Sequence, residues 1–488
     1  MTLEHSSTDS TKPKKRKWLK RLIITLSVIV GLLILATAAF LFISRDYLVW
    51  NNSPRPEVAP ISVNSADMTS YGADALYLVQ MIERVHPIFI VEGYLPDDYT
   101  AIRDEFLAVA QNTTSRQEFV FAAYRYVTTL QDGHMTGFNL FGRGGMTGGH
   151  LEVEWEVYDG RLWLIDNGIR KDIEVTAIGG VSPEQIFAVV DTYVFAENEV
   201  YRMWNYSTYA RYGTMIEIAG GEILDGKATL TLSENGDIST MIVDLEVLEV
   251  RTEPFSMEAI AAAYEFIVRH EMLDDDIFLI DLRLFFLDDS INETANHIEQ
   301  AIEDGVRKFI VDLRGNGGGN SQAGEMLLQA MGITVPSSGI VRRFSPLMTE
   351  IALEHGLISP IDRVFLSISS PLADGMISQP TVDTASNINN VFVAILTDND
   401  TYSSATMMAY WAQDGNFGNI IGAPSRNAPS AFGDMLTFNL PHSGLETRVS
   451  HAQFLRPDVT ADQSTLWPDI MADPADALDV ALEYLRDL

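Results

Sequence analysis

The first patterned part of the chain has apolar residues at helical spacing. Apolar side chains from Leu76 to Val85, and again within residues 102–130, stand three or four positions apart. That spacing places them on one face of a helix. The pattern ends at residues 131–134, Gln-Asp-Gly-His. The sequence therefore predicts a small N-terminal helical domain over residues 67–141.

The next part of the chain alternates apolar and polar residues, as in residues 151–157 and 228–232. Alternation with a period of two, interrupted by polar turns that contain glycine, is typical of β-strands. The sequence predicts a β-rich region over residues 142–255.

From residue 256 onward, short apolar runs alternate with amphipathic segments. The expected elements are strand Ile277–Leu282, helix Ile291–Glu303, strand Phe309–Val311, helix Ser321–Met331, strand Val391–Leu396 and helix Ser404–Gln413. Strands that alternate with helices indicate a parallel sheet with crossover connections. We therefore expect an α/β domain over residues 256–488.

An apolar run of 22 residues without a charge, residues 22–43, precedes all of these segments. Residues 1–21 carry seven basic and two acidic side chains. About 20 apolar residues cross a bilayer as a helix, and a basic flank stays in the cytoplasm. The pattern predicts a cytoplasmic basic tail (1–21), one transmembrane helix (22–43) and a polar, proline-containing linker (44–66). Everything after the helix is then expected outside the cytoplasm, with the chain held at the cell membrane.

A cleaved signal peptide is the alternative interpretation of the same run. The small residues Ala36–Ala39 would suit a cleavage site. Apolar regions of signal peptides span about 7–15 residues, whereas this run continues to Ile43. An uncleaved anchor is the interpretation that we carry forward.

Composition excludes several kinds of site. The 488 residues include 33 basic and 67 acidic side chains, a net charge of −34, which argues against a nucleic-acid-binding body. There is no cysteine, so disulfides, thiolate zinc sites and a cysteine nucleophile are excluded. The nine histidines show no paired spacing typical of zinc ligands. The sequence predicts neither a metal nor a cofactor.

Two segments of the predicted α/β domain join an apolar strand to a turn and the start of a helix. Residues 309–320, FIVDLRGNGGGN, place glycines at such a junction. Backbone N–H groups there could form an oxyanion hole, although an ordinary tight turn would have the same sequence. Residues 391–409 place Ser403 at the start of a helix. A serine in that position is either an exposed nucleophile beside free N–H groups or a plain N-cap.

Together the two segments resemble the tail-specific, or C-terminal-processing, serine peptidase family. DLRGNGGG is similar to that family's oxyanion region and TYSSA to its nucleophile segment, with Ser403 at the catalytic serine. Further likenesses lie in residues 131–134, 176–183, 422–425, 440–445 and 467–470.

The resemblance spans about residues 70–485 and implies an α/β catalytic domain of crotonase-like fold. It also implies that the β-rich region is PDZ-like, that the protein is a serine-type peptidase, and that its substrates are peptides or proteins. The oxyanion donors that it implies are the backbone N–H groups of Gly318 and Ser404.

The chain departs from the family at the general base. The processing branch uses a lysine, but Ala428 occupies that position and no lysine follows Lys308. The guanidinium of Arg426 cannot serve instead, because arginine does not deprotonate in proteins. A serine hydroxyl is a weak nucleophile unless a neighbouring group takes its proton. Another base is therefore needed.

His134 is the predicted base. The tricorn-core branch of the same family is similar, since there a histidine from the N-terminal region serves the serine, and imidazole titrates near neutral pH. His442 and His451 are rivals because they lie closer to Ser403 in the sequence. Which group orients the histidine stays open.

The candidates for that orienting group are the carboxylates of Asp132, Asp458, Asp462 and Asp469. The predicted function is a membrane-anchored, extracytoplasmic peptidase that forms an acyl-enzyme on Ser403. The alternative is a catalytically inactive relative that binds peptides as a scaffold of the cell envelope.

Overall fold

The computed structural model describes residues 13–44, 48–50, 58–61, 68–91, 93, 95–137, 140, 149–166, 168–246, 256–273, 276–343, 345, 349, 353 and 373–488. The predicted domain boundaries near residues 141 and 255, and most of the predicted linker, lie outside these residues. The chain forms two compact units, Met1–Leu48 and Val49–Leu488.

The first unit contains one long helix, α1 (Pro13–Ser44), which includes the predicted span of residues 22–43. Within the part of the chain that the structure describes, no helix combines the length and the apolar character needed to cross a membrane. The transmembrane helix therefore stays a prediction.

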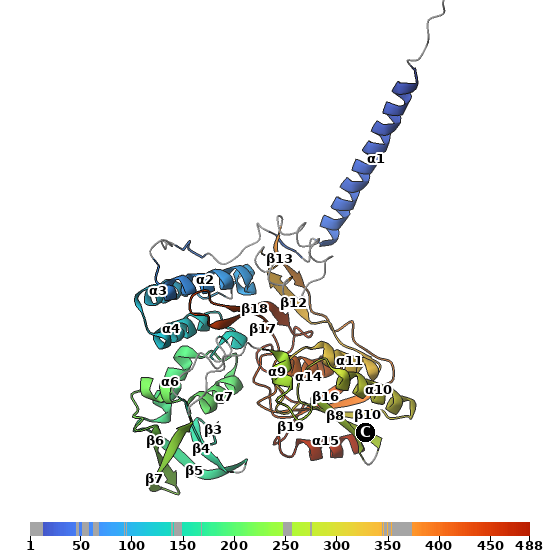
Figure 1. Cartoon of the computed structure of the whole chain (residues 1–488). Helices are drawn as coiled ribbons and strands as arrows, with labels where there is room; N and C mark the ends of the chain where they lie inside the picture. Colours follow the sequence, from blue (N-terminus) through green and yellow to red (C-terminus); the bar gives the residue numbers. More distant parts are fainter. Residues whose placement is uncertain are drawn as a thin grey trace, which may run out of the picture. The chain divides into compact units, whose positions relative to one another are not determined.

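The second unit begins with the helices expected from the sequence (Figure 1). They are α2 (Ser70–Val85), the 3-10 helix η2 (Pro87–Ile90), α3 (Tyr99–Asn112), α4 (Arg116–Thr128) and the 3-10 helix η3 (Gly133–Met135). Thr69 and Ser115 cap α2 and α4, because their side chains accept backbone N–H groups of the first turn.

The β-rich region is an antiparallel sheet in the order β2-β7-β6-β5-β4-β3. Its strands are β2 (His150–Leu151), β3 (Trp155–Tyr158), β4 (Arg161–Asp166), β5 (Ile169–Ile178), β6 (Lys227–Glu234) and β7 (Asp237–Glu246). Between β5 and β6 stand three helices, α6 (Pro183–Tyr193), α7 (Glu199–Tyr209) and α8 (Gly213–Ile218). Strands are present as expected, but the sequence did not predict the three helices between β5 and β6, and the PDZ-like identity stays a prediction.

The α/β part contains a mostly parallel sheet in the order β19-β16-β15-β10-β9-β8, in which only β8 runs antiparallel to its neighbour. The strands are β8 (Val268–Leu273), β9 (Ile277–Leu282), β10 (Lys308–Asp312), β15 (Phe392–Thr397), β16 (Gly418–Gly422) and β19 (Ile470–Met471). The helices of this part are α9 (Met257–Ala261), α10 (Asp289–Glu303), α11 (Gln322–Ala330), α14 (Ser404–Asp414) and α15 (Ala477–Arg486). The six elements predicted here are confirmed, with ends that differ by two residues or fewer.

Alternate residues of the central strands face opposite layers of helices. Val311 and Ile395 belong to the apolar cluster that includes α10, α11 and α14, whereas Ile310 and Leu396 pack with α15. Figure 1 shows α15 on the other side of this sheet from α11. Strands buried on both faces read as continuous apolar runs, which is why they were recognisable in the sequence.

A second sheet, which belongs to the same part of the chain as the mostly parallel sheet, was not predicted. It includes β12 (Gly339–Arg343), β13 (Ala373–Ser378), β17 (Ala431–Asn439) and β18 (Glu446–Leu455), all antiparallel to their neighbours, and a separate small pair joins β11 (Ile333–Thr334) to β14 (Ser386–Asn387). Residues Arg448–Ala452 of β18 are all buried. The sequence therefore has no clean polar–apolar alternation that would mark this strand.

One apolar core joins the helices near the N-terminus to this second sheet. It includes Leu78 and Phe119 from α2 and α4, Leu230 from β6, and Leu436 and Val449 from β17 and β18. The helical segment is therefore packed with strands that lie more than 300 residues later in the chain. This packing brings η3 beside β17 and β18.

A buried ion pair fixes the far end of α14. Arg456 donates to both carboxylate oxygens of Asp414, and the two side chains are 4% and 2% exposed. Removal of one partner from such a pair leaves an uncompensated buried charge, which typically costs about 3–5 kcal/mol.

We expect Asp414→Ala to lower the free energy of unfolding by about 3–5 kcal/mol for this reason. The matched control is Glu105→Ala, which removes an exposed ion pair with Arg125 whose side chains are both 49% exposed, and should cost about 1 kcal/mol or less. Urea unfolding of the full chain, followed by circular dichroism, measures both. Equal stability of the two variants would show that the pair does not hold α14.

Candidate active site

Ser403 lies where two loops meet at one edge of the parallel sheet. β10 and β15 are adjacent and parallel, so the loops that follow their carboxyl ends lie side by side. One is the glycine loop after Asp312, and the other leads into α14. Ser403 is the residue before this helix and remains partly exposed.

The backbone of Ser403 is held in a conformation that serine rarely adopts. Its φ is 54° and its ψ is −121°. Such a conformation costs about 1–3 kcal/mol and persists only where the surroundings impose it. Here the Ser403 N–H donates to Oδ1 of Asn427 at 2.9 Å. A Cβ added at Gly318 would lie 2.7 Å from Cβ of Ser403, so only glycine fits against the serine.

His134 reaches Ser403 from η3. Its Nε2 lies 3.1 Å from Oγ of Ser403, although 269 residues separate the two in the chain. Its other ring nitrogen, Nδ1, lies 3.2 Å from the hydroxyl of Tyr402. The histidine is 7% exposed. The structure thus brings together the predicted nucleophile and the predicted base.

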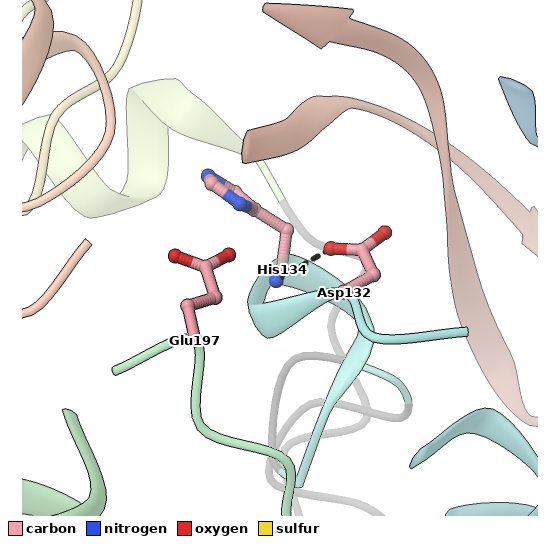
Figure 2. Close-up of side chains that lie close together, drawn as sticks. All are labelled: Asp132, His134 and Glu197. Carbon is pink, nitrogen blue, oxygen red and sulfur yellow. Dashed lines mark hydrogen bonds between the residues drawn. The ribbon is translucent and has the colours of Figure 1, made fainter. Parts of the chain in front are cut away.

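Asp132 contacts the backbone of His134 and makes no hydrogen bond to its ring. One carboxylate oxygen accepts the His134 N–H at 2.8 Å, and the ring points away from this carboxylate (Figure 2). The other oxygen is 3.0 Å from Nε2 of His86. His86 Nδ1 accepts the N–H of Ile88, so the hydrogen of a neutral His86 is on Nε2 and points to Asp132. Asp132 therefore fixes η3.

The other candidates for the orienting group lie elsewhere. Asp458 and Asp462 accept hydrogen bonds from Thr460 and Ser464 in their own turns. Asp469 accepts from the N–H of Ile420 and from the side chain of Gln413. None of these three carboxylates has a hydrogen bond to His134 among the described residues, so of the four candidates only Asp132 contacts the histidine.

The rival histidines are not at the serine. The His442 N–H donates to Asp74, and its side chain is exposed. His451 is held by Asp434, whose backbone oxygen and carboxylate face its two ring nitrogens. In the described part of the chain, neither side chain is hydrogen-bonded to Ser403.

Glu197 connects three distant segments beneath the histidine. Oε1 accepts the N–H of Gly133 at 3.2 Å, and Oε2 accepts the side-chain amide of Asn427 at 2.6 Å and the N–H of Ala428 at 2.8 Å. Asn427 in turn holds Ser403. The carboxylate of Glu197 therefore positions both the segment of the base and that of the nucleophile.

Burial and charge shift the pKa values of the acid–base groups. Burial raises the pKa of Glu197 to about 7, although the hydrogen bonds from its three N–H donors lower it. Burial lowers the pKa of His134, with Asp132 opposing the shift and Arg426 adding to it. Burial alone would raise the pKa of Asp132, but the hydrogen bond and charge of His86 lower it. His134 is therefore mostly neutral, and able to accept a proton, at neutral pH.

The two predicted oxyanion donors differ in their present partners. Ser404 is the first residue of α14, so its N–H has no acceptor within the helix. Among the described residues this N–H donates to no other group. The Gly318 N–H donates to Oδ1 of Asn316 at 2.8 Å. Ser404 thus offers a free donor, whereas Gly318 must release or share its hydrogen bond to become one.

Sequence patterns alone do not point to Tyr402, Asn427, Glu197 or His86. Tyr402 and Asn427 directly precede Ser403 and Ala428, so both lie in segments that the family resemblance had already marked. Glu197 stands in a stretch with no recognisable motif, and His86 ends a helix. Only the fold shows what these two side chains contact.

One group of described residues has the spacing of metal ligands. Ligand atoms of Asp132, His134 and Glu197 all lie within 4.8 Å of one another (Figure 2). The ring nitrogens of His134 already face Ser403 and Tyr402, and Glu197 has three N–H donors. A cation there would have to replace hydrogen bonds that form the site.

Residues 276–472, which include Ser403, match the family model of Peptidase family S41. The predicted enzyme class, a serine-type peptidase and therefore a hydrolase, is confirmed, and its substrates are peptides or proteins.

Solved structures with the same fold include mature CPAF complexed with lactacystin, with 13% identity and a TM-score of 0.56 over 86% of this chain and 97% of that chain. Mature CPAF alone has 13% identity and a TM-score of 0.55, over 85% of this chain and 95% of that chain. The photosystem II D1 C-terminal processing protease has 13% identity and a TM-score of 0.41, over 83% and 94%. No curated protein matches the chain.

The Glu197 carboxyl should make stability depend on pH. Its pKa is about 7 in the folded chain against an ordinary value of 4.5, so between these pH values the native state binds more protons than the unfolded state. Stability therefore falls as pH rises through this window, by up to about 3 kcal/mol.

We expect Glu197→Gln to lack this decline, so that the free energy of unfolding of the wild type falls relative to that of the variant between pH 4.5 and pH 7.5. Urea unfolding at several pH values measures the difference, and Glu105→Gln is the exposed control. A difference that stays constant with pH would contradict the raised pKa.

Proposed function

We propose that this chain hydrolyses peptide bonds through an acyl-enzyme on Ser403, with His134 as general base, outside the cytoplasm and anchored to the membrane. The observation that carries the catalytic part is the 3.1 Å contact between His134 Nε2 and Ser403 Oγ. A serine that is merely an N-cap has no need of a buried imidazole at its hydroxyl.

The proposed reaction begins when Ser403 Oγ attacks the carbonyl carbon of the scissile peptide bond and its proton passes to His134 Nε2. Negative charge then develops on the carbonyl oxygen. The free N–H of Ser404, at the positive end of α14, can bind this oxygen. Gly318 can contribute if its N–H turns from Asn316.

Collapse of the tetrahedral intermediate breaks the C–N bond, and His134 gives the proton to the leaving amine. Water then attacks the ester, again losing a proton to His134, and Ser403 is restored. Every step uses one histidine as acid and base, so the absence of the family's lysine does not prevent the cycle.

The anchored location rests on the N-terminal segment. Exposed apolar side chains line the described part of α1, among them Trp18, Leu22, Ile24 and Leu35. Exposed apolar surfaces are typical of membrane or protein contact sites, and the basic residues before this one favour a cytoplasmic N-terminus. The finer fold assignments, a crotonase-like catalytic domain and a PDZ-like region, belong to this proposal too.

We expect His134→Ala and Ser403→Ala each to lower kcat on a peptide substrate by about 10³-fold or more. His442→Ala, the matched control, should retain activity because its side chain is exposed and away from Ser403. Digestion of a peptide library by the full chain measures all three. An unimpaired His134→Ala enzyme ends the assignment of the base.

The pH profile gives an independent check on the base. Because burial lowers the pKa of His134, the neutral base accumulates at lower pH, and kcat/KM should reach its histidine-dependent plateau at lower pH than an unshifted histidine would give. Wild-type protein that folds, cleaves no peptide and fails to react with a fluorophosphonate at Ser403 would favour the inactive scaffold.

The anchor predicts that residues 22–43 remain in the mature protein. Mass spectrometry of the native N-terminus, with membrane extraction at alkaline pH, measures this. A mature chain that begins near Ala39 would identify the run as a cleaved signal peptide, and release from membranes without detergent would contradict the anchor.

A further inference from the structure

We infer that the phenol of Tyr402, in place of a carboxylate, holds His134 in the tautomer that can accept the serine proton. The inference deepens the proposed function and rests on it for its catalytic meaning. Tyr402 is a positioning residue in this assignment, since it acts through the histidine.

The geometry of the ring sets the requirement. For Nε2 of a neutral His134 to accept the proton of Ser403 Oγ, the ring hydrogen must be on Nδ1. The hydroxyl oxygen of Tyr402, 3.2 Å from Nδ1, can accept that hydrogen. If Tyr402 instead donated to Nδ1, the hydrogen would be on Nε2 and the ring could not act as base.

A backbone carbonyl fixes the proton of the neighbouring Tyr201. The hydroxyl of Tyr201 lies 3.2 Å from the carbonyl oxygen of Gly133. A carbonyl oxygen can only accept, so Tyr201 must donate its single proton to it.

The ring of Tyr201 packs edge-on against that of Tyr402. Since the proton of Tyr201 is committed to Gly133, Tyr201 does not donate to the oxygen of Tyr402. The oxygen of Tyr402 is then left to accept from Nδ1 of His134. The inferred hydrogen bonds therefore run from Ser403 Oγ through His134 to the oxygen of Tyr402.

Packing keeps Tyr402 in this position. It is 7% exposed, its ring centroid lies 4.7 Å from that of His134 and 5.6 Å from that of Tyr201, and the Arg426 guanidinium stands 4.9 Å above its ring. Burial raises the pKa of Tyr402 well above its ordinary value, so the phenol keeps its proton throughout the physiological range.

Tyr402 also directly precedes Ser403 in the sequence. The strained backbone that positions Ser403 therefore also positions Tyr402, which in turn orients His134. The phenol is also a neutral acceptor, which binds a ring N–H less strongly than a carboxylate does. Loss of the phenol should thus cost less than loss of a triad carboxylate, which is about 10⁴-fold.

The test compares Tyr402→Phe with Tyr410→Phe in the full chain. Tyr410 is the matched control, because it is also buried, lies in α14 and hydrogen-bonds Ser338 instead of His134. Nitrogen NMR of the protein labelled with ¹⁵N at histidine reports the tautomer, and His134→Gln identifies the His134 signals. The rate of Ser403 labelling by a fluorophosphonate reports the reactivity of the serine.

The wild type and Tyr410→Phe are expected to have the hydrogen of His134 on Nδ1. In Tyr402→Phe a substantial fraction should move to Nε2, and the labelling rate and kcat should fall by about 10-fold to 100-fold, with KM little changed. A wild-type ring with its hydrogen on Nε2 overturns the inference, even if Tyr402→Phe does not fold.

An unchanged tautomer in folded Tyr402→Phe also overturns it. The outcome for the proposed function is separate. If the chain cleaves no peptide but has the expected tautomers, the role of Tyr402 stands and the proposed peptidase activity is wrong. If the chain cleaves peptides but Tyr402→Phe leaves the tautomer of His134 unchanged, the peptidase activity stands and the role of Tyr402 is wrong.

Discussion

The site depends on one apolar core that the helices near the N-terminus share with β17 and β18. Phe119 of α4 and Val449 of β18 belong to the same cluster. Without this packing, His134 would have no fixed relation to a serine on the parallel sheet. Glu197 completes the connection, because its carboxylate accepts N–H groups from both Gly133 and Ala428. Hydrophobic burial brings the segments together, and a few polar contacts set their register.

In the described part of the chain, the carboxylates around His134 form hydrogen bonds with backbone N–H groups and not with its imidazole ring. Asp132 and Glu197 both accept backbone N–H groups of η3, and the ring hydrogen bonds go to neutral partners. Burial lowers the pKa of His134, while the nearby charges of Asp132 and Arg426 act on it in opposite directions. Such a site relies on fixed geometry, and this geometry is stabilised by the same hydrogen bonds that connect the segments.

The sequence predicted the parts that depend on local pattern. Strands buried on both faces, such as Phe309–Val311, could be predicted because burial restricts which residues fit. The glycine loop after this strand could be predicted because turn geometry does the same. The second sheet and Glu197 were not predictable. β18 buries consecutive residues, and Glu197 acquires its role only from N–H groups that approach it from other segments. Ser403 and His134 were named in advance, but the contact between them required the fold.

The position of His134 in the chain determines when the proposed active site can form during synthesis. His134 is made early in synthesis and Ser403 269 residues later, and β18, on which η3 rests, follows the serine by more than 40 residues. The pair can form only when nearly the whole chain has been made and packed. In a partly made or partly unfolded chain Ser403 has no His134 beside it, so the proposed peptidase is inactive until folding is finished.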